Sequence, residues 1–526
     1  MIRKHYLSAA MVVALLAVIQ VAFVSCGKGS DDTRLVIITF DGLRWQELFS
    51  GADEELLGDT RFVSNPEQAK ERFWADTPES RRELVAPFLW SYVPEHGYLI
   101  GNKNKDSRMT VSNTLRFSYP GYSEMFCGWA DDDRIVSNDP IPNPNTSVLE
   151  VVNRDSRYKG QVMMLSSWES IRYAVNNDRA GIPASSAHEP CYAETPTAQI
   201  VQEIDEYITA ATDDSERADV ITYAFALEVL KKKHPKVFYV GFGDTDEWAH
   251  GSKYDRYLEA IKTTDKYIKR IVETCESDPF YKGKTVYMLT CDHGRGRGPM
   301  FRTHGADVRG AEETWFIAFG KGIPALGETS GNGPFFTKQL SASIASVLGV
   351  EFTPDNGVAV EPFDPEFYKA PEPPKAAASF KAVEASPKGR GLRYAYSEGD
   401  FMSVKEVIAV PVKASGVTPV FTTSMKQRED HFGLVFKGLL KIDKTGLYLL
   451  SLACDDGAKL WVDGQLLWDI DRDGGGFKED YFEFESGCHR VEVQYFENYG
   501  GETIELGLVG EGINVENLPA EMLYHE

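Results

Sequence analysis

The stretch LVIITF at residues 35–40, followed at once by Asp41, decides the fold that we expect for most of this chain. It is a continuous apolar run, without the alternation of a strand that has one face in water. Such runs are typical of strands covered by helices on both faces. Asp41 then lies at the carboxyl end of a buried strand, where α/β proteins place their ligands.

Three more runs of this kind follow, at residues 237–242, 286–290 and 315–319. Helical patterns lie between the runs, at Gln199 to Ala211, Asp219 to Lys233 and Tyr254 to Thr274. Strands that alternate with helices indicate an α/β domain with a mostly parallel sheet between helices. We therefore interpret all four apolar runs as buried parallel strands of residues 34–365.

The C-terminal part has a different pattern. Residues 366–379 are rich in Pro and Ala and predict a linker. Beyond it, four short runs have the composition of strands, at residues 446–452, 459–462, 465–468 and 490–496. Asp463-Gly464 between the middle two is a strong hairpin signal. We expect an antiparallel β-sandwich over residues 380–526.

The first residues predict export. Arg3 and Lys4 precede an apolar run, and small residues end it, so residues 1–25 have the pattern of a secretory signal. A membrane anchor is the alternative, although about 18 residues is marginal for spanning. Cys26 resembles the lipidated cysteine of bacterial lipoproteins, with residues 26–33 as a tether. We expect an exported lipoprotein at the outer membrane or cell surface, or facing the periplasm.

The composition excludes some classes of protein. The 526 residues include 56 Lys+Arg and 79 Asp+Glu, a net charge of -23, and no stretch forms a basic patch. An acidic body repels phosphate backbones, so we expect no binding to nucleic-acid polymers. No Cys-x-x-Cys occurs among the 7 cysteines, which argues against thiolate metal sites. The sequence leaves open whether Cys454 and Cys488 form a disulfide.

Acid and histidine groups follow the ends of three predicted strands. In chain order they are Asp41, Asp246, His250, Asp292, His293 and His304. Because the ends of parallel strands meet at one edge of a sheet, we expect these groups to converge. Carboxylate and neutral imidazole are zinc ligands, and six of them suffice for two Zn²⁺ ions. Taken singly, each group has a structural alternative, such as a helix cap or a packed histidine.

With Ser118-Tyr119-Pro120 between them, these motifs resemble the alkaline phosphatase superfamily, and most closely its nucleotide pyrophosphatase/phosphodiesterase branch. The resemblance covers residues 34–365 and rests on an ordered set: Asp41-Gly42, Ser118-Tyr119-Pro120, Asp246 with His250, Asp292-His293-Gly294 and His304-Gly305. It implies an alkaline-phosphatase-like sheet between helices. It also implies one zinc on Asp246, His250 and His304 and another on Asp41, Asp292 and His293. The nucleophile, which also contacts metal, falls on Ser118.

Ser118 also makes physical sense as the nucleophile. Pro120 can open a helix at its first position, which places Ser118 at the amino end, where N–H groups and the helix dipole favour an alkoxide and a phosphate. Zinc would lower the pKa of the hydroxyl further. Ser123, one turn into the helix, is the rival nucleophile, with capping or packing as its alternative role.

Two positions depart from the patterns of the superfamily. Where the phosphodiesterase branch is expected to carry an Asn that holds a phosphoryl oxygen, this chain has Gly121. Arg295, Arg297 and Arg302 are candidates for the missing substrate-binding donor, with a solvated loop as the alternative. Sulfatases share the fold but require an Arg where this chain has Tyr122, and they bind calcium, so we disfavour a sulfatase.

The C-terminal motifs, among them Asp455-Asp456-Gly457, resemble the protective-antigen-type β-sandwich, which is often a carbohydrate-binding module. The resemblance implies that Asp455 and Asp456 bind Ca²⁺, whereas a turn cap is the alternative. Asp469, Asp471 and Asp473 copy the first half of a calcium loop, although a plain loop between strands explains them as well.

We therefore expect a zinc-dependent phosphohydrolase, foremost a phosphodiesterase, that acts through a Ser118 phosphoenzyme intermediate. Its substrate would be a small phosphate ester or a glycan-linked phosphoester. Phosphomonoesterase, phosphonate hydrolase and phosphoryl mutase activities use the same ligands and stay open. A glycan-binding adhesin with an inactive metalloenzyme domain is the alternative from another class.

Overall fold

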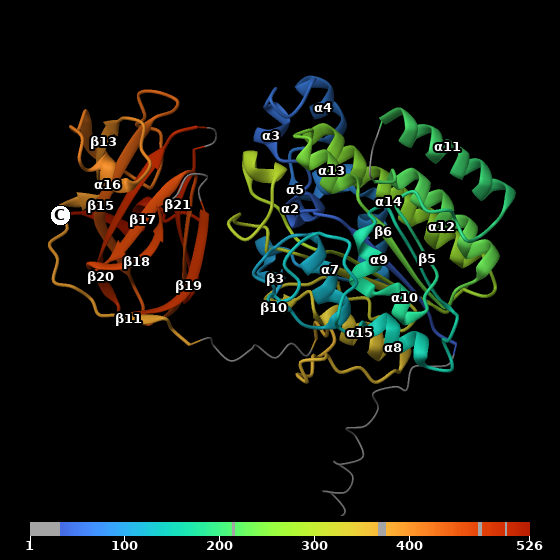
Figure 1. The fold of residues 1–526 in the computed structure, drawn as a ribbon. Helices are drawn as coiled ribbons and strands as arrows, with labels where there is room; N and C mark the ends of the chain where they lie inside the picture. The colour runs from blue at the N-terminus through green and yellow to red at the C-terminus, as the bar shows by residue number, and fades with distance from the viewer. Residues whose placement is uncertain (1–31, 213–215, 367–374, 472–475, 500–501) are drawn as a thin grey trace, which may run out of the picture.

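The computed structural model describes residues 32–212, 216–366, 375–471, 476–499 and 502–526. The described elements form two units that lie side by side (Figure 1). The first runs from β1 (Arg34–Phe40) to α15 (Gln339–Leu348), and the second from β11 (Ala378–Phe380) to β23 (Leu523–His525). The predicted signal and Cys26 lie outside the described residues. Among the described residues, no helix is both long and apolar enough to cross a membrane.

The first unit is built on an eight-stranded sheet of order β5-β4-β6-β1-β7-β8-β2-β9. Besides β1 its strands are β2 (Gly97–Ile100), β4 (Val162–Ser166), β5 (Ala184–Ser186), β6 (Val237–Phe242), β7 (Thr285–Cys291), β8 (Phe316–Gly320) and β9 (Gly327–Glu328). β1 lies between β6 and β7 and is parallel to both. Every residue of these three strands is buried, which explains their unbroken apolar runs. The α/β prediction is confirmed.

The direction of one strand was wrong in the sequence-based prediction. β8 pairs antiparallel with β7, although its apolar run predicts a parallel strand. Helices cover both faces of the sheet here as well, and that cover makes a run continuous whichever way the strand points. Composition therefore reports burial on two faces, whereas the direction depends on the path of the connecting segment.

Alternate residues of β1 enter two separate cores, one on each face of the sheet. Val36 and Ile38 face one core, and Leu35 and Ile37 face the other. The first face is covered by α2 (Trp45–Ser50), α3 (Glu54–Gly58), α4 (Pro66–Phe73), α5 (Pro78–Val85), α6 (Pro87–His96), α11 (Pro196–Thr212), α12 (Asp219–Lys233), α13 (Asp244–His250) and α14 (Tyr254–Ser277). The second face is covered by α7 (Ser118–Cys127), α8 (Val148–Arg154), α9 (Ser170–Val175), α10 (Asn177–Ala180) and α15. A separate two-stranded sheet joins β3 (Ser107–Thr110) and β10 (Asn332–Phe336).

The second unit is a sandwich of two mostly antiparallel sheets, as predicted. One sheet has the order β11-β19-β16-β21-β22, with β16 (Gly446–Cys454), β19 (Gly476–Phe484), β21 (Ile504–Gly510) and β22 (Ile513–Val515). The other has the order β12-β23-β15-β20-β17-β18, with β12 (Gly389–Arg390), β15 (Phe432–Ile442), β17 (Gly457–Val462), β18 (Gln465–Ile470) and β20 (Gly487–Glu497); β13 (Leu392–Glu398) and β14 (Ala414–Thr418) extend it. Their inner faces share one core. Cys454 and Cys488 are both free thiols.

Candidate metal centre

The turn after β1 joins the ends of two neighbouring strands. Gly42 has a φ of 57°, and a Cβ there would lie 2.6 Å from Asp246 Oδ1 and 2.7 Å from Arg295 Nη1. Its backbone N–H donates to Asp292 Oδ1 at 3.0 Å. Only glycine fits this position, and it lets the carboxylates that follow β1 and β7 approach each other.

The structure brings all six predicted ligands together. His293 Nε2 lies 3.4 Å from both Asp41 Oδ1 and Asp292 Oδ2. Asp246 and His250 lie one turn apart on α13, and His250 Nε2 is 3.1 Å from Asp246 Oδ2. His304, in the loop after β7, places its Nε2 3.0 Å from that of His250. The predicted strand ends therefore converge on one place, as their positions along the chain imply.

These donors form two overlapping groups of three potential metal ligands, which share His293. The first group consists of Asp41, Asp292 and His293, and the second of Asp246, His293 and His304. Within each group the donor atoms lie within 4.8 Å of one another. Asp292 Oδ2 and His304 Nδ1 are buried without a hydrogen-bond partner. Buried polar atoms are rarely left without a partner, and carboxylate with neutral imidazole is the donor set that zinc prefers. His250 borders the second group.

The electrostatics of this cluster also favour bound cations. Burial and the nearby Asp246 raise the pKa of Asp41, and burial and Asp41 raise that of Asp292 well above its usual range. Burial alone would lower the pKa of His293, but Asp292 and Asp41 raise it to about 9. Carboxylates this close together disfavour one another's charge, and a bound cation would remove that repulsion.

Ser118 lies inside the ligand cluster. Its Oγ donates to Asp41 Oδ1 at 3.3 Å and lies 3.2 Å from His293 Nε2. Helix α7 begins at Ser118 itself, so Pro120 stands in the first turn rather than at the first position that we expected. The rival Ser123 is buried elsewhere and accepts a hydrogen bond from Asn143 Nδ2 at 2.9 Å. Of the two serines, only Ser118 contacts the ligands.

Gly121 explains one departure from the patterns of the superfamily. A Cβ on this residue would lie 2.4 Å from the backbone oxygen of Asp292, so α7 packs directly on the chain that carries two ligands. No side chain fits there. The neighbouring Tyr122 donates its hydroxyl to Asp41 Oδ2 at 3.2 Å. Tyr122, which stands where sulfatases require Arg, therefore contacts a candidate ligand and does not line the Ser118 cavity.

A cavity of about 400 Å³ opens onto the cluster and is lined by Asp41, Ser118, Asn138, Trp168, Glu216, Asp246, Glu247, His250 and His304. The sequence analysis did not single out Asn138, Trp168 or Glu216. Asn138 Oδ1 accepts the backbone N–H of Tyr119 at 2.9 Å, which leaves its amide NH₂ group for the cavity. Because these residues come from separate loops with no strand or helix pattern, no local signal in the sequence identifies them.

The predicted substrate-binding arginines lie elsewhere. Arg295 is fully buried beside Asp246, with which it pairs, and donates to the backbone oxygens of Phe301 and Arg302 at 2.6 and 2.9 Å. Arg297 pairs with Glu313 at 2.6 Å. Neither of them, nor Arg302, lines the Ser118 cavity, and no other described lysine or arginine does. This placement does not support a contact of Arg295 or Arg297 with substrate.

The acids that predict calcium sites serve local contacts in the second unit. Asp456 Oδ2 accepts the N–H groups of Asn498 and Tyr499, at 2.5 and 3.2 Å. Lys459 Nζ lies 3.0 Å from a carboxylate oxygen of both Asp469 and Asp471. Asp473 lies outside the described residues. Among the described ones, these acids form no group of three potential ligands, and calcium binding at Asp455 and its neighbours stays a prediction.

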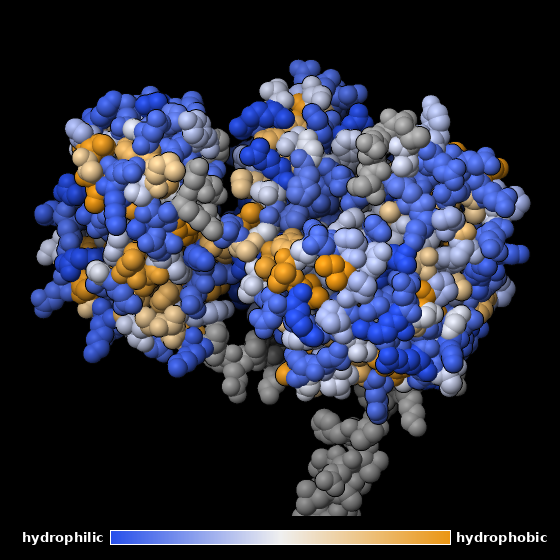
Figure 2. Space-filling model, viewed as in Figure 1, coloured by the Kyte–Doolittle hydropathy of each residue, from blue (hydrophilic) through white to orange (hydrophobic). Residues whose placement is uncertain are grey.

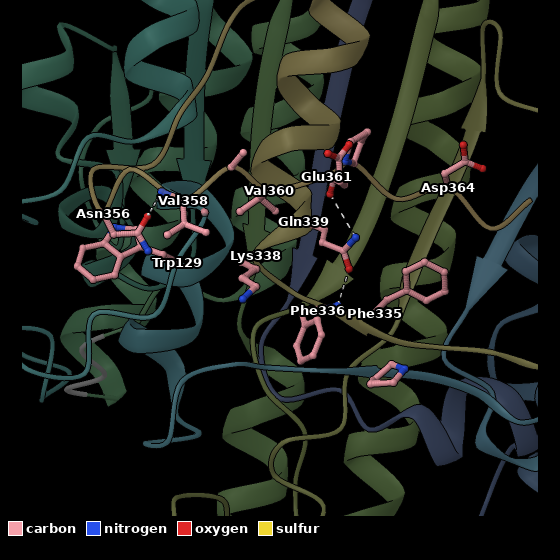
Figure 3. A pocket seen from close by; sticks show the side chains of 14 residues that line it. Trp129, Phe335, Phe336, Lys338, Gln339, Asn356, Val358, Val360, Glu361 and Asp364 are labelled. Carbon is pink, nitrogen blue, oxygen red and sulfur yellow. Dashed lines mark hydrogen bonds between the residues drawn. The ribbon is translucent and has the colours of Figure 1, made fainter. Parts of the chain in front are cut away.

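A second cavity, of about 570 Å³, lies beyond the carboxyl end of α7 (Figure 3). Its wall is mainly apolar and includes Trp129, Phe335 and Val358. Gln339 crosses it, accepting the N–H of Phe336 at 2.8 Å and donating to the backbone oxygen of Glu361 at 3.2 Å. None of the predicted ligands lines this cavity, which lies at the other end of the helix from the Ser118 cavity.

Comparison with known families agrees with this placement. Residues 201–305 match the model of the metalloenzyme superfamily, and residues 420–520 match that of the PA14 domain. The first match includes every predicted ligand except Asp41. The predicted resemblance is confirmed at the level of the metalloenzyme superfamily for the first part and of the PA14 domain for the second, whereas the phosphodiesterase branch stays a prediction. No curated protein matches the chain.

Similar solved structures include a protein of the alkaline phosphatase superfamily from Vibrio parahaemolyticus, with 13% identity over 62% of this chain and 69% of that one and a TM-score of 0.39. The PA14 sugar-binding domain of an RTX adhesin shows 17% identity over 26% of this chain and 99% of its own, with a TM-score of 0.23. An anti-sigma factor domain-containing protein shows 20% identity over 26% of this chain, which spans about half (49%) of that protein, with a TM-score of 0.23. The similarities are partial, so the family assignment rests on the two family models.

Proposed function

We propose that this protein is a zinc-dependent phosphodiesterase that works through a phosphoserine at Ser118. The observation that carries the proposal is the position of the Ser118 hydroxyl, 3.3 Å from Asp41 Oδ1 and 3.2 Å from His293 Nε2, at the amino end of α7 and on the wall of a cavity. A hydroxyl among metal ligands at a helix amino end has the surroundings of an activated nucleophile.

Different residues of the chain have different roles in the proposed reaction. Zinc, when bound to the carboxylates and histidines, would lower the pKa of the serine hydroxyl and offset the charge of the phosphate. Asp41 orients the hydroxyl through its hydrogen bond. The Ser118 oxygen attacks phosphorus and loses its proton, while the P–O bond to the leaving group breaks and the departing oxygen takes up a proton. Water then attacks phosphorus, the P–Oγ bond breaks and Ser118 regains its proton. The Asn138 amide is placed to donate to a non-bridging oxygen as charge develops there.

The charges around the cavity favour a diester over a monoester. No described lysine or arginine lines the cavity, whereas the carboxyl groups of Glu216 and Glu247 do; burial and the nearby Glu247 raise the pKa of Glu216 to about 9. A monoester carries a second negative charge at neutral pH, and the described lining of the cavity offers no lysine or arginine to pair with it. A diester carries only one charge and avoids this cost. Monoesterase, phosphonate hydrolase and mutase activities on the same ligands are therefore the weaker candidates.

The PA14 match supports a carbohydrate as a further partner, so we propose a glycan-linked phosphodiester as the natural substrate. An exported lipoprotein anchored through Cys26 is part of the same proposal, because surface glycans lie outside the cytoplasm.

Replacing the nucleophile tests the proposal. In Ser118→Ala, hydrolysis of bis(4-nitrophenyl) phosphate should fall by about 10³-fold or more, and in Asn138→Ala by about 10²-fold. Ser123→Ala is the matched control and should retain activity. Turnover of 4-nitrophenyl phosphate, measured alongside, should be lower than that of the diester in the wild type. Full activity in Ser118→Ala would remove this serine from the mechanism.

A further inference from the structure

The segment between β7 and β8 connects the metal centre to the sandwich. It carries His304 and also Arg309, whose Nη1 donates to Glu505 Oε2 at 3.0 Å and to the backbone oxygen of Glu516 at 2.7 Å. Both acceptors belong to the second unit. Figure 1 shows β19 and β21 on the side of the sandwich that faces the first unit.

A second arginine makes the same crossing beside the nucleophile. Arg116, two residues before Ser118, donates to Glu312 Oε2 at 3.3 Å and to Glu479 Oε1 of β19 at 3.4 Å. Glu312 also accepts the N–H of Gly310 at 3.0 Å. The segment before Ser118 and the segment after His304 are thus tied to each other and to one sheet of the sandwich, the first through β19 and the second through β21.

Phe477 lies between these two arginines. The guanidinium carbons of Arg116 and Arg309 lie 5.5 and 5.8 Å from the centre of its ring. Phe477 is only 4% exposed, yet it is absent from the hydrophobic core of the sandwich. The first unit therefore supplies its cover, and cation–π attraction adds to this contact.

Strand β21 leaves room for the Arg309 guanidinium. A Cβ on Gly507 would lie 2.7 Å from Arg309 Nη2 and 2.5 Å from Ser451 Oγ. The contact is thus specific in shape as well as in charge. Arg297 adds a third connection, because it pairs with Glu313 of its own segment and with Glu516 of the sandwich.

We propose that the sandwich helps to position the catalytic centre. Phe477, Glu479 and Glu505 hold Arg116 and Arg309. These two arginines are positioning residues, because they fix the segments that carry Ser118 and His304. The expected change in turnover rests on the proposed function, whereas the expected change in structure does not. Activity on a small diester that does not reach the sandwich therefore depends on the sandwich.

The test compares two phenylalanines of β19 in the full-length chain. Phe477 and Phe482 are each 4% exposed, but Phe482 packs in the core of the sandwich and Phe477 on the arginines. In metal-free Phe477→Ala, amide hydrogen exchange should accelerate in residues 112–118 and 295–313. In Phe482→Ala it should accelerate only within the sandwich. Glu505→Gln, a milder change at the same contact, should accelerate exchange in residues 295–313.

Turnover is measured on the same variants. For bis(4-nitrophenyl) phosphate, kcat should fall by about tenfold or more in Phe477→Ala and stay near the wild-type value in Phe482→Ala. Unchanged exchange in Phe477→Ala and Glu505→Gln, or equal acceleration at residues 295–313 in Phe477→Ala and Phe482→Ala, would overturn the proposal. If the wild type hydrolyses no phosphodiester but the exchange pattern is as expected, the proposed function fails and the positioning role stands.

Discussion

Adding one methyl group at Gly121 should separate the nucleophile from its ligands. The Cβ of Gly121→Ala would lie 2.4 Å from the backbone oxygen of Asp292, where ordinary contact begins at about 3.4 Å. Helix α7 must therefore move by roughly 1 Å relative to the end of β7, and Ser118 moves with it. A misplacement of that size costs about 10²-fold in turnover, and overpacking costs about 1–3 kcal/mol of stability.

The assay is kcat/KM for bis(4-nitrophenyl) phosphate with zinc, beside a thermal unfolding curve. Gly58→Ala is the matched control, since a Cβ at the end of α3 meets nothing within 4 Å. It should keep full activity. If Gly121→Ala is destabilised but its kcat/KM stays within threefold of the wild type, the position of α7 does not control catalysis and the reasoning fails.

Two further predictions concern metal and pH. Removing zinc with a chelator should abolish diesterase activity and lower the melting temperature, because Asp292 Oδ2 and His304 Nδ1 then stay buried without a partner. Zn²⁺ added back should restore both the activity and the melting temperature. Recovery with Ca²⁺ alone would contradict the zinc assignment. Burial raises the pKa of Asp265 to about 6 although it accepts the N–H groups of Phe88 and Leu89, so its contribution to stability is full below about pH 4 and is lost as the pH rises through 6. In urea unfolding of the metal-free protein, the free energy of unfolding of the wild type should therefore fall by about 1–2 kcal/mol relative to that of Asp265→Asn between pH 5 and pH 8. A difference between the two proteins that does not change with pH would refute the role of Asp265.

The cluster of candidate ligands could be predicted from the sequence because most of its residues follow a strand directly or lie on the helix after one. Asp41 and Asp292 come directly after apolar runs that only buried strands explain, and the parallel pairing of β1 with β7 brings their ends together. The order of the motifs along the chain was therefore enough to predict a cluster in space. The direction of β8 could not be obtained in this way, because burial on both faces gives the same composition in either direction.

The wall of the cavity could not be predicted, for a different physical reason. Asn138 reaches the site through a loop, and a hydrogen bond to the backbone of Tyr119 fixes its amide, a contact between segments that leaves no periodic pattern. Gly121 lacks the side chain that would contact a phosphoryl oxygen, and the structure gives the reason: α7 packs so closely on Asp292 that no side chain fits there.

The arginines near the site form ion pairs both within the first unit and with acids of the sandwich. The loop after β7 carries several arginines, and we expected Arg295, Arg297 or Arg302 either to bind phosphate or to lie in a solvated loop. In the structure Arg295 pairs with Asp246, while Arg297 and Arg309 turn to acids of the sandwich. Positive charge that a monoesterase would direct at its substrate is thus engaged in holding ligands and joining the units. In the proposed mechanism, bound cations and the Asn138 amide would face the phosphate, and that arrangement suits the single charge of a diester.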